Sequence, residues 1–169
     1  FRNPASVGGS IYGRFGCSDV LTAFLALDTF VELYDGGTIR LSEFVNRKPD
    51  KDILLSVIVR KSKRKFRYES IRQTKTDFPV IACSVVTGMV HGKETWYFSV
   101  GARPMKAALL EKQWEIPADA SEDMIADYAR QAASEFTYGT NMRGSAEYRR
   151  HLAEVLIRRE MASILAEGK

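Results

Sequence analysis

The chain has 169 residues, of which 45% are hydrophobic and 27% are charged, and its formal net charge is +4. This balance is that of an ordinary globular protein and excludes collagen-like and intrinsically disordered chains. The longest apolar runs, at 20–27 and 53–59, fall well short of the roughly 20 residues that span a bilayer, so we expect no membrane helix.

The first part of the chain combines a glycine-rich stretch, a helix and a hairpin. The sequence "SVGGS" at 6–10 predicts a tight turn, and a short helix is expected to begin at Ser18 or Asp19, which both suit the N-cap position. A hairpin is expected over 29–44, with its turn at 35–37, because the two glycines there adopt positive φ readily.

After a polar linker at 45–52, the pattern changes to β-rich runs and then to helices. Apolar and β-branched runs predict four strands of an antiparallel meander, at 52–59, 65–74, 80–90 and 94–103. The spacing of apolar residues predicts three helices after them, at 104–114, 121–136 and 145–168. Strands followed by helices predict an α+β fold, in which a small antiparallel sheet of three to four strands is covered on one face by helices.

The cysteines and histidines predict neither a metal site nor a disulfide. Cys17 and Cys83 lie far apart without a C-x-x-C partner, which indicates a reducing cytoplasm and buried or idle thiols. His91 and His151 lack metal-ligand spacing, so we expect no metal. No recognisable acid–base or nucleophilic set can be assembled, so we expect no catalytic side chain, and the first residues carry no secretory signal.

The glycine pair in "SVGGS" is the first candidate for ligand binding. Two successive glycines let the backbone approach a ligand closely, and their N–H groups can converge on a phosphate. The helix expected at Ser18 begins a few residues later, and helix N-termini also attract anions. A Gly-Gly pair is more often only a turn, so the residues by themselves leave both interpretations open.

Longer stretches carry a resemblance that covers essentially the whole chain. "RNPASVGGSI", "CSDVLTAFLALDTFVEL" and "IRLSEF" resemble the end of the FAD-binding domain in the flavoprotein (medium) subunits of the molybdenum hydroxylase family, which includes xanthine dehydrogenase and carbon monoxide dehydrogenase. "DILLSVIV", "WYFSVGARP" and above all "NMRGSAEYRRHLAEVLIRR" resemble that family's small C-terminal domain. The resemblance implies that residues 1–48 are the C-terminal part of the FAD-binding domain and that residues 49–169 are the C-terminal domain.

The resemblance also implies a set of FAD contacts. The family's second flavin loop, whose backbone and hydroxyl groups contact FAD, corresponds to Ser6, Val7, Gly8, Gly9 and Ser10. Ser10 stands where an Asn is usual. Asp19 corresponds to an acidic FAD contact, with helix capping as its structural alternative. Leu54 corresponds to an apolar residue beside the isoalloxazine ring, with plain core packing as the alternative. Tyr68 falls near a position where some members have a Lys, and it is not included among the predicted contacts.

Function and partners follow from the same resemblance. The complete subunit would take electrons from an iron–sulfur subunit, which receives them from a molybdopterin subunit, and FAD would pass them to NAD or another acceptor. The sequence lacks the family's first glycine-rich flavin loop and opens at Phe1 without an initiator Met. We therefore expect a C-terminal fragment that is inactive alone and binds FAD weakly or not at all.

Two basic stretches have alternative interpretations. "RKSKRKFR" at 60–67 is either a solvated hairpin tip, which we favour, or a surface for nucleic acid or an acidic protein, as in a non-enzymatic α+β binding module. Nucleic acid is accordingly the less favoured partner. "RGSAEYRR" at 143–150 could hold an anion or a partner, and we expect it instead to cap and dock the last helix.

Overall fold

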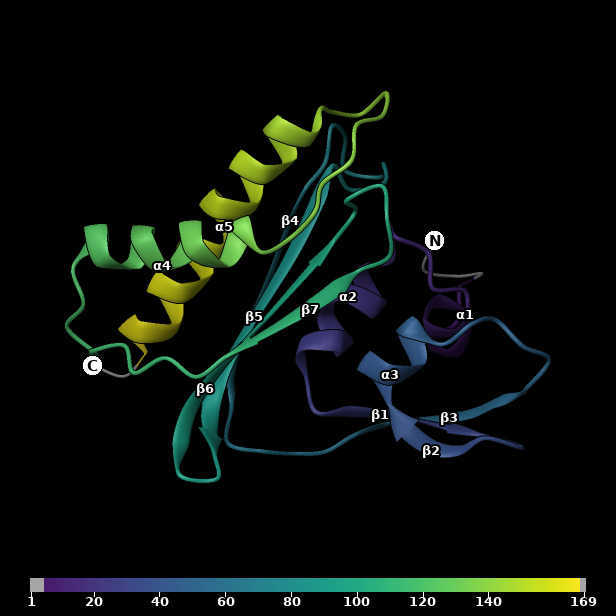
Figure 1. The fold of residues 1–169 in the computed structure, drawn as a ribbon. Coiled ribbons are helices and arrows are strands. Elements are labelled where there is room, and N and C mark those ends of the chain that lie inside the picture. The colour runs from purple at the N-terminus through teal and green to yellow at the C-terminus, as the bar shows by residue number, and fades with distance from the viewer. Residues whose placement is uncertain (1–4, 168–169) are drawn as a thin grey trace.

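The computed structural model describes residues 5–167. Residues 5–59 form one small unit of short helices and strands (Figure 1). Its elements are α1 (Val7–Tyr12), α2 (Asp19–Ala26), β1 (Thr29–Leu33), β2 (Gly37–Arg40), α3 (Leu41–Asn46) and β3 (Leu54–Val59). The three strands form an antiparallel sheet of order β2-β1-β3, so β1 pairs with both neighbours. Apolar residues of α2, α3 and β1 make up the core of this unit.

The rest of the described chain forms a four-stranded antiparallel sheet and two longer helices. These elements are β4 (Lys65–Ile71), β5 (Ile81–Val90), β6 (Lys93–Gly101), β7 (Ala108–Lys112), α4 (Glu122–Ser134) and α5 (Ala146–Ala166). The order β4-β5-β6-β7 is a meander, in which each strand pairs with the next. His91 and Gly92 join β5 to β6, and both have positive φ, as a two-residue hairpin turn requires. The predicted α+β fold is confirmed.

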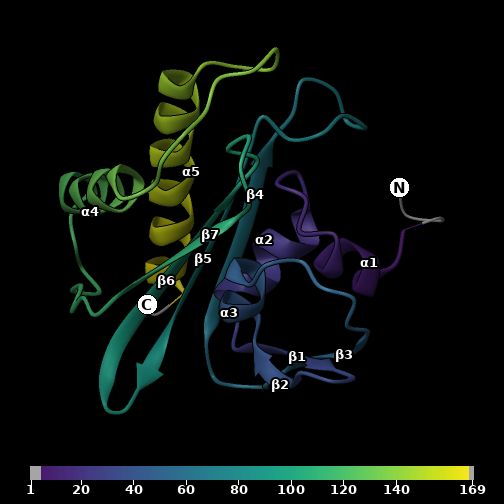
Figure 2. The same ribbon diagram turned by 45° about the vertical axis from the view of Figure 1, so that its right-hand side comes forward.

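Both faces of the four-stranded sheet are covered. Figures 1 and 2 show α4 and α5 on one face and the unit of α1–α3 and β1–β3 on the other. Helix α5 contacts β4 and β5, and α2 contacts β5, β6 and β7. Residues 81–87 of β5 are consequently buried at every position, as expected for a strand with both faces covered. The sequence led us to expect a cover on one face only, because it does not show that α2 docks on the other.

The stretch 104–114, which we expected to be a helix, contains β7 instead. Its alanines, leucines and lysines favour helices in isolation, and this preference misled the prediction. In the structure the side chains alternate with a period of two. Ala107 and Leu109 pack with the core around α2, whereas Ala108 and Leu110 pack with the core under α4 and α5. Pairing with β6 between two apolar cores therefore outweighs the intrinsic helix preference.

Three expectations for the first part of the chain are also corrected. "SVGGS" is not a loop, because Ser6 caps α1 and the glycines are helical residues. The second strand of the hairpin ends at Arg40, because Leu41, Phe44 and Val45 have helical spacing and form the buried side of α3. β3 pairs with β1 and so does not join the later meander. The division of the chain at residue 48 stays a prediction.

Serine caps begin the helices where the sequence indicates them. The side chains of Ser18, Ser121 and Ser145 each accept a hydrogen bond from the backbone N–H three residues further on. Acidic residues follow in the first turn of each helix, where they interact favourably with the helix dipole. Among residues 5–167, no helix is long and apolar enough to cross a membrane.

Candidate functional site

Helix α1 and its cap contain five of the residues predicted to contact FAD. The Ser6 Oγ accepts a hydrogen bond from the Gly9 N–H at 3.0 Å, as the N-cap of this helix. The Ser10 hydroxyl donates to the Ser6 carbonyl oxygen at 2.9 Å. Both serine side chains are thus engaged within the helix turn. The N–H groups of the glycines follow the helix axis and do not form the open phosphate loop that the sequence suggested.

Two hollows flank α1, and together they include all seven predicted contacts. The α1 hollow has a volume of about 510 Å³, and its lining includes Ser6, Val7, Ser10 and Asp19. The Leu54 hollow has a volume of about 480 Å³, and its lining includes Ser6, Gly8, Gly9 and Leu54. A Cβ added to Gly8 would lie 3.9 Å from Leu54 Cδ2, so the β3 side chain sits across from uncovered backbone of α1.

Asp19 is held by Tyr68 of β4 and by Arg72 in the loop after β4. The Arg72 guanidinium forms an ion pair with Asp19 Oδ2 at 2.6 Å, and the Tyr68 hydroxyl donates to Asp19 Oδ1 at 2.5 Å. Burial and the hydrogen bond to Asp19 raise the pKa of Tyr68 above its usual range, so the phenol remains a proton donor. Arg72 also donates to the Asp77 carbonyl oxygen at 2.9 Å, which connects Asp19 to the loop after β4.

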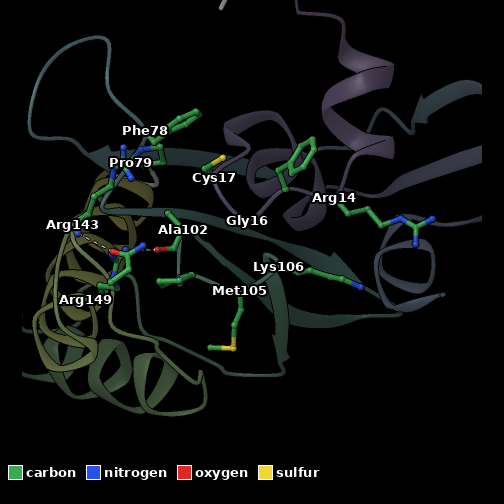
Figure 3. Close-up of a pocket in the computed structure, with 13 residues that line it drawn as sticks. Arg14, Gly16, Cys17, Phe78, Pro79, Ala102, Met105, Lys106, Arg143 and Arg149 are labelled. Carbon is green, nitrogen blue, oxygen red and sulfur yellow. Dashed lines mark hydrogen bonds between the residues drawn. The ribbon is translucent and has the colours of Figure 1, made fainter. Parts of the chain in front are cut away.

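A third hollow, of about 390 Å³, adjoins the α1 hollow and is shown in Figure 3. We call it the arginine hollow; its lining includes Phe15, Cys17, Phe78, Pro79, Met105, Asn141, Arg143 and Arg149. No acidic residue of the described range 5–167 lines it. Arg14 and Lys106 also border it, but Figure 3 shows their side chains extending away from the other lining residues. They donate instead to the carbonyl oxygens of Arg47 and Val45.

Arg149 is the buried centre of the "RGSAEYRR" stretch. Its side chain is only 1% exposed and donates to the carbonyl oxygens of Val80 and Ala102 and to Asn141 Oδ1. Burial, and then the positive charge of Arg143, lower the pKa of Arg149, but an arginine remains protonated at physiological pH. These bonds join α5 to β5 and to the end of β6, so the stretch docks the last helix as expected.

Arg143 lies beside Arg149 and reaches the loop after β4. Its guanidinium forms an ion pair with Asp77 at 3.0 Å and lies 5.4 Å from the centre of the Phe78 ring. The hydrogen bond from Arg143 holds the pKa of Asp77 below its ordinary value. The Arg143 Nε is buried and has no hydrogen-bond partner among the described residues.

The basic stretch 60–67 connects β3 to β4 and is largely engaged with neighbouring side chains. Arg60 lies over the Phe30 ring at 4.1 Å, and Arg64 lies over the Tyr97 ring at 4.9 Å. Lys65 donates to the Ile164 carbonyl oxygen and Arg67 forms an ion pair with Glu167, which ties β4 to the end of α5. Much of this charge therefore stabilises the fold, although Lys61 and Lys63 are exposed.

Sequence reasoning did not find Arg72 or the arginine hollow. Arg72 and Asp19 are 53 residues apart, and no local pattern marks them as partners. The arginine hollow combines the segment after α1, the loop after β4 and the turn before α5, which come together only in the folded chain. The one available signal was the cluster of arginines in "RGSAEYRR".

Several solved structures share this fold at low sequence identity. Quinoline 2-oxidoreductase from Pseudomonas putida 86 matches with a TM-score of 0.80 at 15% identity, over 98% of this chain and 62% of its own. A second match is carbon monoxide dehydrogenase from Hydrogenophaga pseudoflava that lacks the Mo-pyranopterin moiety of the molybdenum cofactor. Its TM-score is 0.77 at 16% identity, and the match covers 98% of this chain and 62% of the Hydrogenophaga chain. Reconstituted CO dehydrogenase from Oligotropha carboxidovorans matches with a TM-score of 0.74 at 18% identity, over 96% of this chain and 61% of its own. The chain thus spans about three fifths of the length of these structures.

Sequence comparisons identify the family. No curated protein matches the chain. The family model of the CO dehydrogenase flavoprotein C-terminal domain matches residues 66–164, which hold the four-stranded sheet, α4 and most of α5. This match covers more than half of the chain and confirms the resemblance inferred from its sequence. The chain belongs to the CO dehydrogenase flavoprotein C-terminal domain family.

Proposed function

We propose that the chain is part of the FAD-binding subunit of a cytoplasmic, molybdenum-containing hydroxylase or dehydrogenase. An iron–sulfur subunit, supplied in turn by a molybdopterin subunit, delivers electrons to FAD, which passes them to NAD, as in enzymes of the xanthine dehydrogenase type, or to another acceptor. Family membership and the molybdenum cofactor named for the Hydrogenophaga enzyme support this proposal. The observation that carries it is the gathering of all seven predicted FAD contacts around α1.

The residues around α1 fit an aromatic group with polar edges, such as an isoalloxazine ring. Val7 is 50% exposed and shares the α1 hollow with Phe15 and Val20, which together offer an apolar surface. Gly8 presents bare backbone, because a Cβ there would meet only Leu54, at an ordinary contact distance. FAD supplies the electron-transfer chemistry when it is bound, and the chain contributes binding and orientation.

Asp19 is the polar group best placed to orient such a ligand. Arg72 and Tyr68 hold its two carboxylate oxygens, so the side chain has a defined position before any ligand arrives. Each carboxylate oxygen has two lone pairs, so Asp19 keeps acceptor capacity for a ligand N–H or hydroxyl. The N-cap of α2 is Ser18 and not Asp19, so the capping alternative for Asp19 is wrong; Asp19 follows in the first turn, where its carboxylate interacts favourably with the helix dipole.

Flavin binding by the full-length protein tests the proposal. A Gly8→Ala variant should keep its unfolding temperature, because there is room for the methyl group, but should bind FAD about tenfold more weakly, since the methyl group blocks close approach to the backbone. Ser10→Asn, which places the family's usual residue in the α1 hollow, should strengthen binding. Ser42→Ala in α3 is a control, because Ser42 lines neither the α1 hollow nor the Leu54 hollow.

Fluorescence titration with FAD gives the dissociation constant of the parent and of each variant. Full-length protein that carries no flavin, or a Gly8→Ala variant that binds FAD as tightly as the parent, would contradict the proposal. We expect the 169 residues by themselves to bind FAD weakly or not at all, because the family's first glycine-rich flavin loop is not among them.

A further inference from the structure

We propose that the arginine hollow binds the phosphate group of a ligand with an aromatic body, at a site next to the flavin site and separate from it. The hollow adjoins the α1 hollow and shares Phe15, Cys17, Phe78 and Pro79 with it. None of the seven predicted FAD contacts lines the arginine hollow. The proposal therefore goes beyond the proposed flavin function and does not depend on it.

The charges around the arginine hollow are unbalanced. Arg149 is 1% exposed and forms no ion pair within residues 5–167, because all of its hydrogen-bond acceptors are neutral carbonyl or amide oxygens. Arg143 has a single carboxylate partner in the described part of the chain, Asp77. Two guanidinium groups thus face one carboxylate. A buried positive charge without a counter-charge is unfavourable, and an anion placed in the hollow would relieve this imbalance.

Arg143 has donors left for such an anion. Its Nη2 donates to Asp77 at 3.0 Å, whereas its Nη1 and its buried Nε have no hydrogen-bond partner in the described part of the chain. Asn141 lies next to it, and among residues 5–167 its side chain uses only the Oδ1, which accepts from the Arg143 backbone N–H and from the Arg149 guanidinium. The Asn141 amide N–H groups therefore remain as further donors. A planar guanidinium fork binds phosphate through two parallel hydrogen bonds, and a neighbouring amide can add another.

The walls of the hollow are apolar and suit an aromatic body. Phe15 is 67% exposed and Met105 is 38% exposed, although both are large apolar side chains. Phe78 is also partly exposed, and the Arg143 guanidinium lies over its ring, 5.4 Å from the ring centre. Exposed apolar residues around a concave site with a few polar groups are typical of ligand-binding sites. A ring could contact Met105 and Phe78 while its phosphate reaches Arg143.

Phenyl phosphate is a suitable probe, because it combines the two groups that the hollow would recognise. Isothermal titration calorimetry on the full-length protein should show binding of phenyl phosphate, weaker binding of inorganic phosphate, and no detectable binding of phenol. Arg143→Gln should weaken the binding of phenyl phosphate at least about tenfold, since a charge-assisted bidentate contact is lost. Arg158→Gln, at an exposed position of α5, is the matched control and should bind like the parent.

An Asp77→Asn variant gives a change in the opposite direction. Removing this carboxylate frees Arg143 and removes the nearest negative charge, so phenyl phosphate should bind about threefold more tightly or better. A variant that merely damages the fold would not gain affinity. Arg143→Gln and parent protein with equal affinities, or phenol binding as well as phenyl phosphate, would overturn the proposal. Displacement of phenyl phosphate by FAD would also overturn it, because the site would then belong to the flavin.

Discussion

Thr22 of α2 lies directly against Gly101 of β6. A Cβ built on Gly101 would stand 2.0 Å from the Thr22 Oγ1 and 3.2 Å from its Cβ. Thr22 is fully buried. The backbone N–H of Ala102, the residue after Gly101, donates to the Gly16 carbonyl oxygen at 2.5 Å. The first unit of the chain is therefore docked on the four-stranded sheet with its backbone close to that of β6, and the absence of a side chain at residue 101 permits this approach.

Substitution of Gly101 tests this docking. Gly101→Ala should lower the free energy of unfolding by about 1–3 kcal/mol, because the added methyl group overlaps the Thr22 hydroxyl in a packed core. Chemical denaturation measures the change. The double variant Gly101→Ala/Thr22→Ala should recover part of the loss, which would appear as a coupling energy between the two sites. Strictly additive effects of the two substitutions would show that α2 does not rest on β6 in this way.

Arg149 should be among the most sensitive positions of the chain. Arg149→Ala removes the donors for the Val80 and Ala102 carbonyl oxygens and leaves these two buried acceptors unpaired, and it also removes the hydrogen bonds to Gly144 and Asn141. We expect a loss of about 3–5 kcal/mol in the free energy of unfolding. Arg150→Ala is the matched control, because Arg150 is the exposed neighbour on the same helix and its loss should cost less than about 0.5 kcal/mol. Equal midpoints of denaturation for the two variants would refute a docking role for Arg149.

Glu160 should make stability depend on pH. It lies on α5, is only 2% exposed, and its carboxylate oxygens have no hydrogen-bond partner among the described residues. Burial, and then the negative charge of Glu69, raise the pKa of Glu160 well above its ordinary value of 4.5. The folded state therefore binds this proton more tightly than the unfolded state does. Its contribution to stability is present below about pH 4.5 and is lost as the pH rises toward the folded-state pKa.

A Glu160→Gln variant removes this titration. The variant should exceed the parent in free energy of unfolding by about 1–3 kcal/mol at pH 7, and the difference should shrink as the pH falls toward 4. Denaturant titrations at intervals between pH 4 and pH 8 measure it. Glu115→Gln, at an exposed loop position, should show no such trend. A difference between Glu160→Gln and the parent that stays constant over this range would show that Glu160 does not titrate with the predicted shift.

Local chemistry made several elements predictable. The serine caps of α2, α4 and α5 and the turn at His91-Gly92 depend on residues within a few positions of one another, so the sequence indicates them directly. The strands β4, β5 and β6 were predictable because long apolar and β-branched runs suit a buried sheet. Of the predicted site, α1 and Leu54 do border the same part of the molecule.

Elements with conflicting local signals were not predictable. β7 has helix-favouring residues, and only the unpaired edge of β6 and the two cores beside it make it a strand. The glycines of α1 suggested a loop, and Ser6 instead caps a short helix. For β7, pairing with β6 outweighs the local helix preference, and for α1 the local hydrogen bond to Ser6 outweighs the low helix propensity of the glycines.

The sequence by itself determined the family resemblance, the α+β class and the residues expected to contact FAD, because these depend on residue types in a given order. The tertiary structure decided which charges meet. It joined Asp19 to Arg72 and Tyr68, and it brought Arg143 and Arg149 beside Phe15 and Phe78. These groups are far apart along the chain, and their interactions depend on distance and burial, which exist only once the two apolar cores have packed against the same sheet.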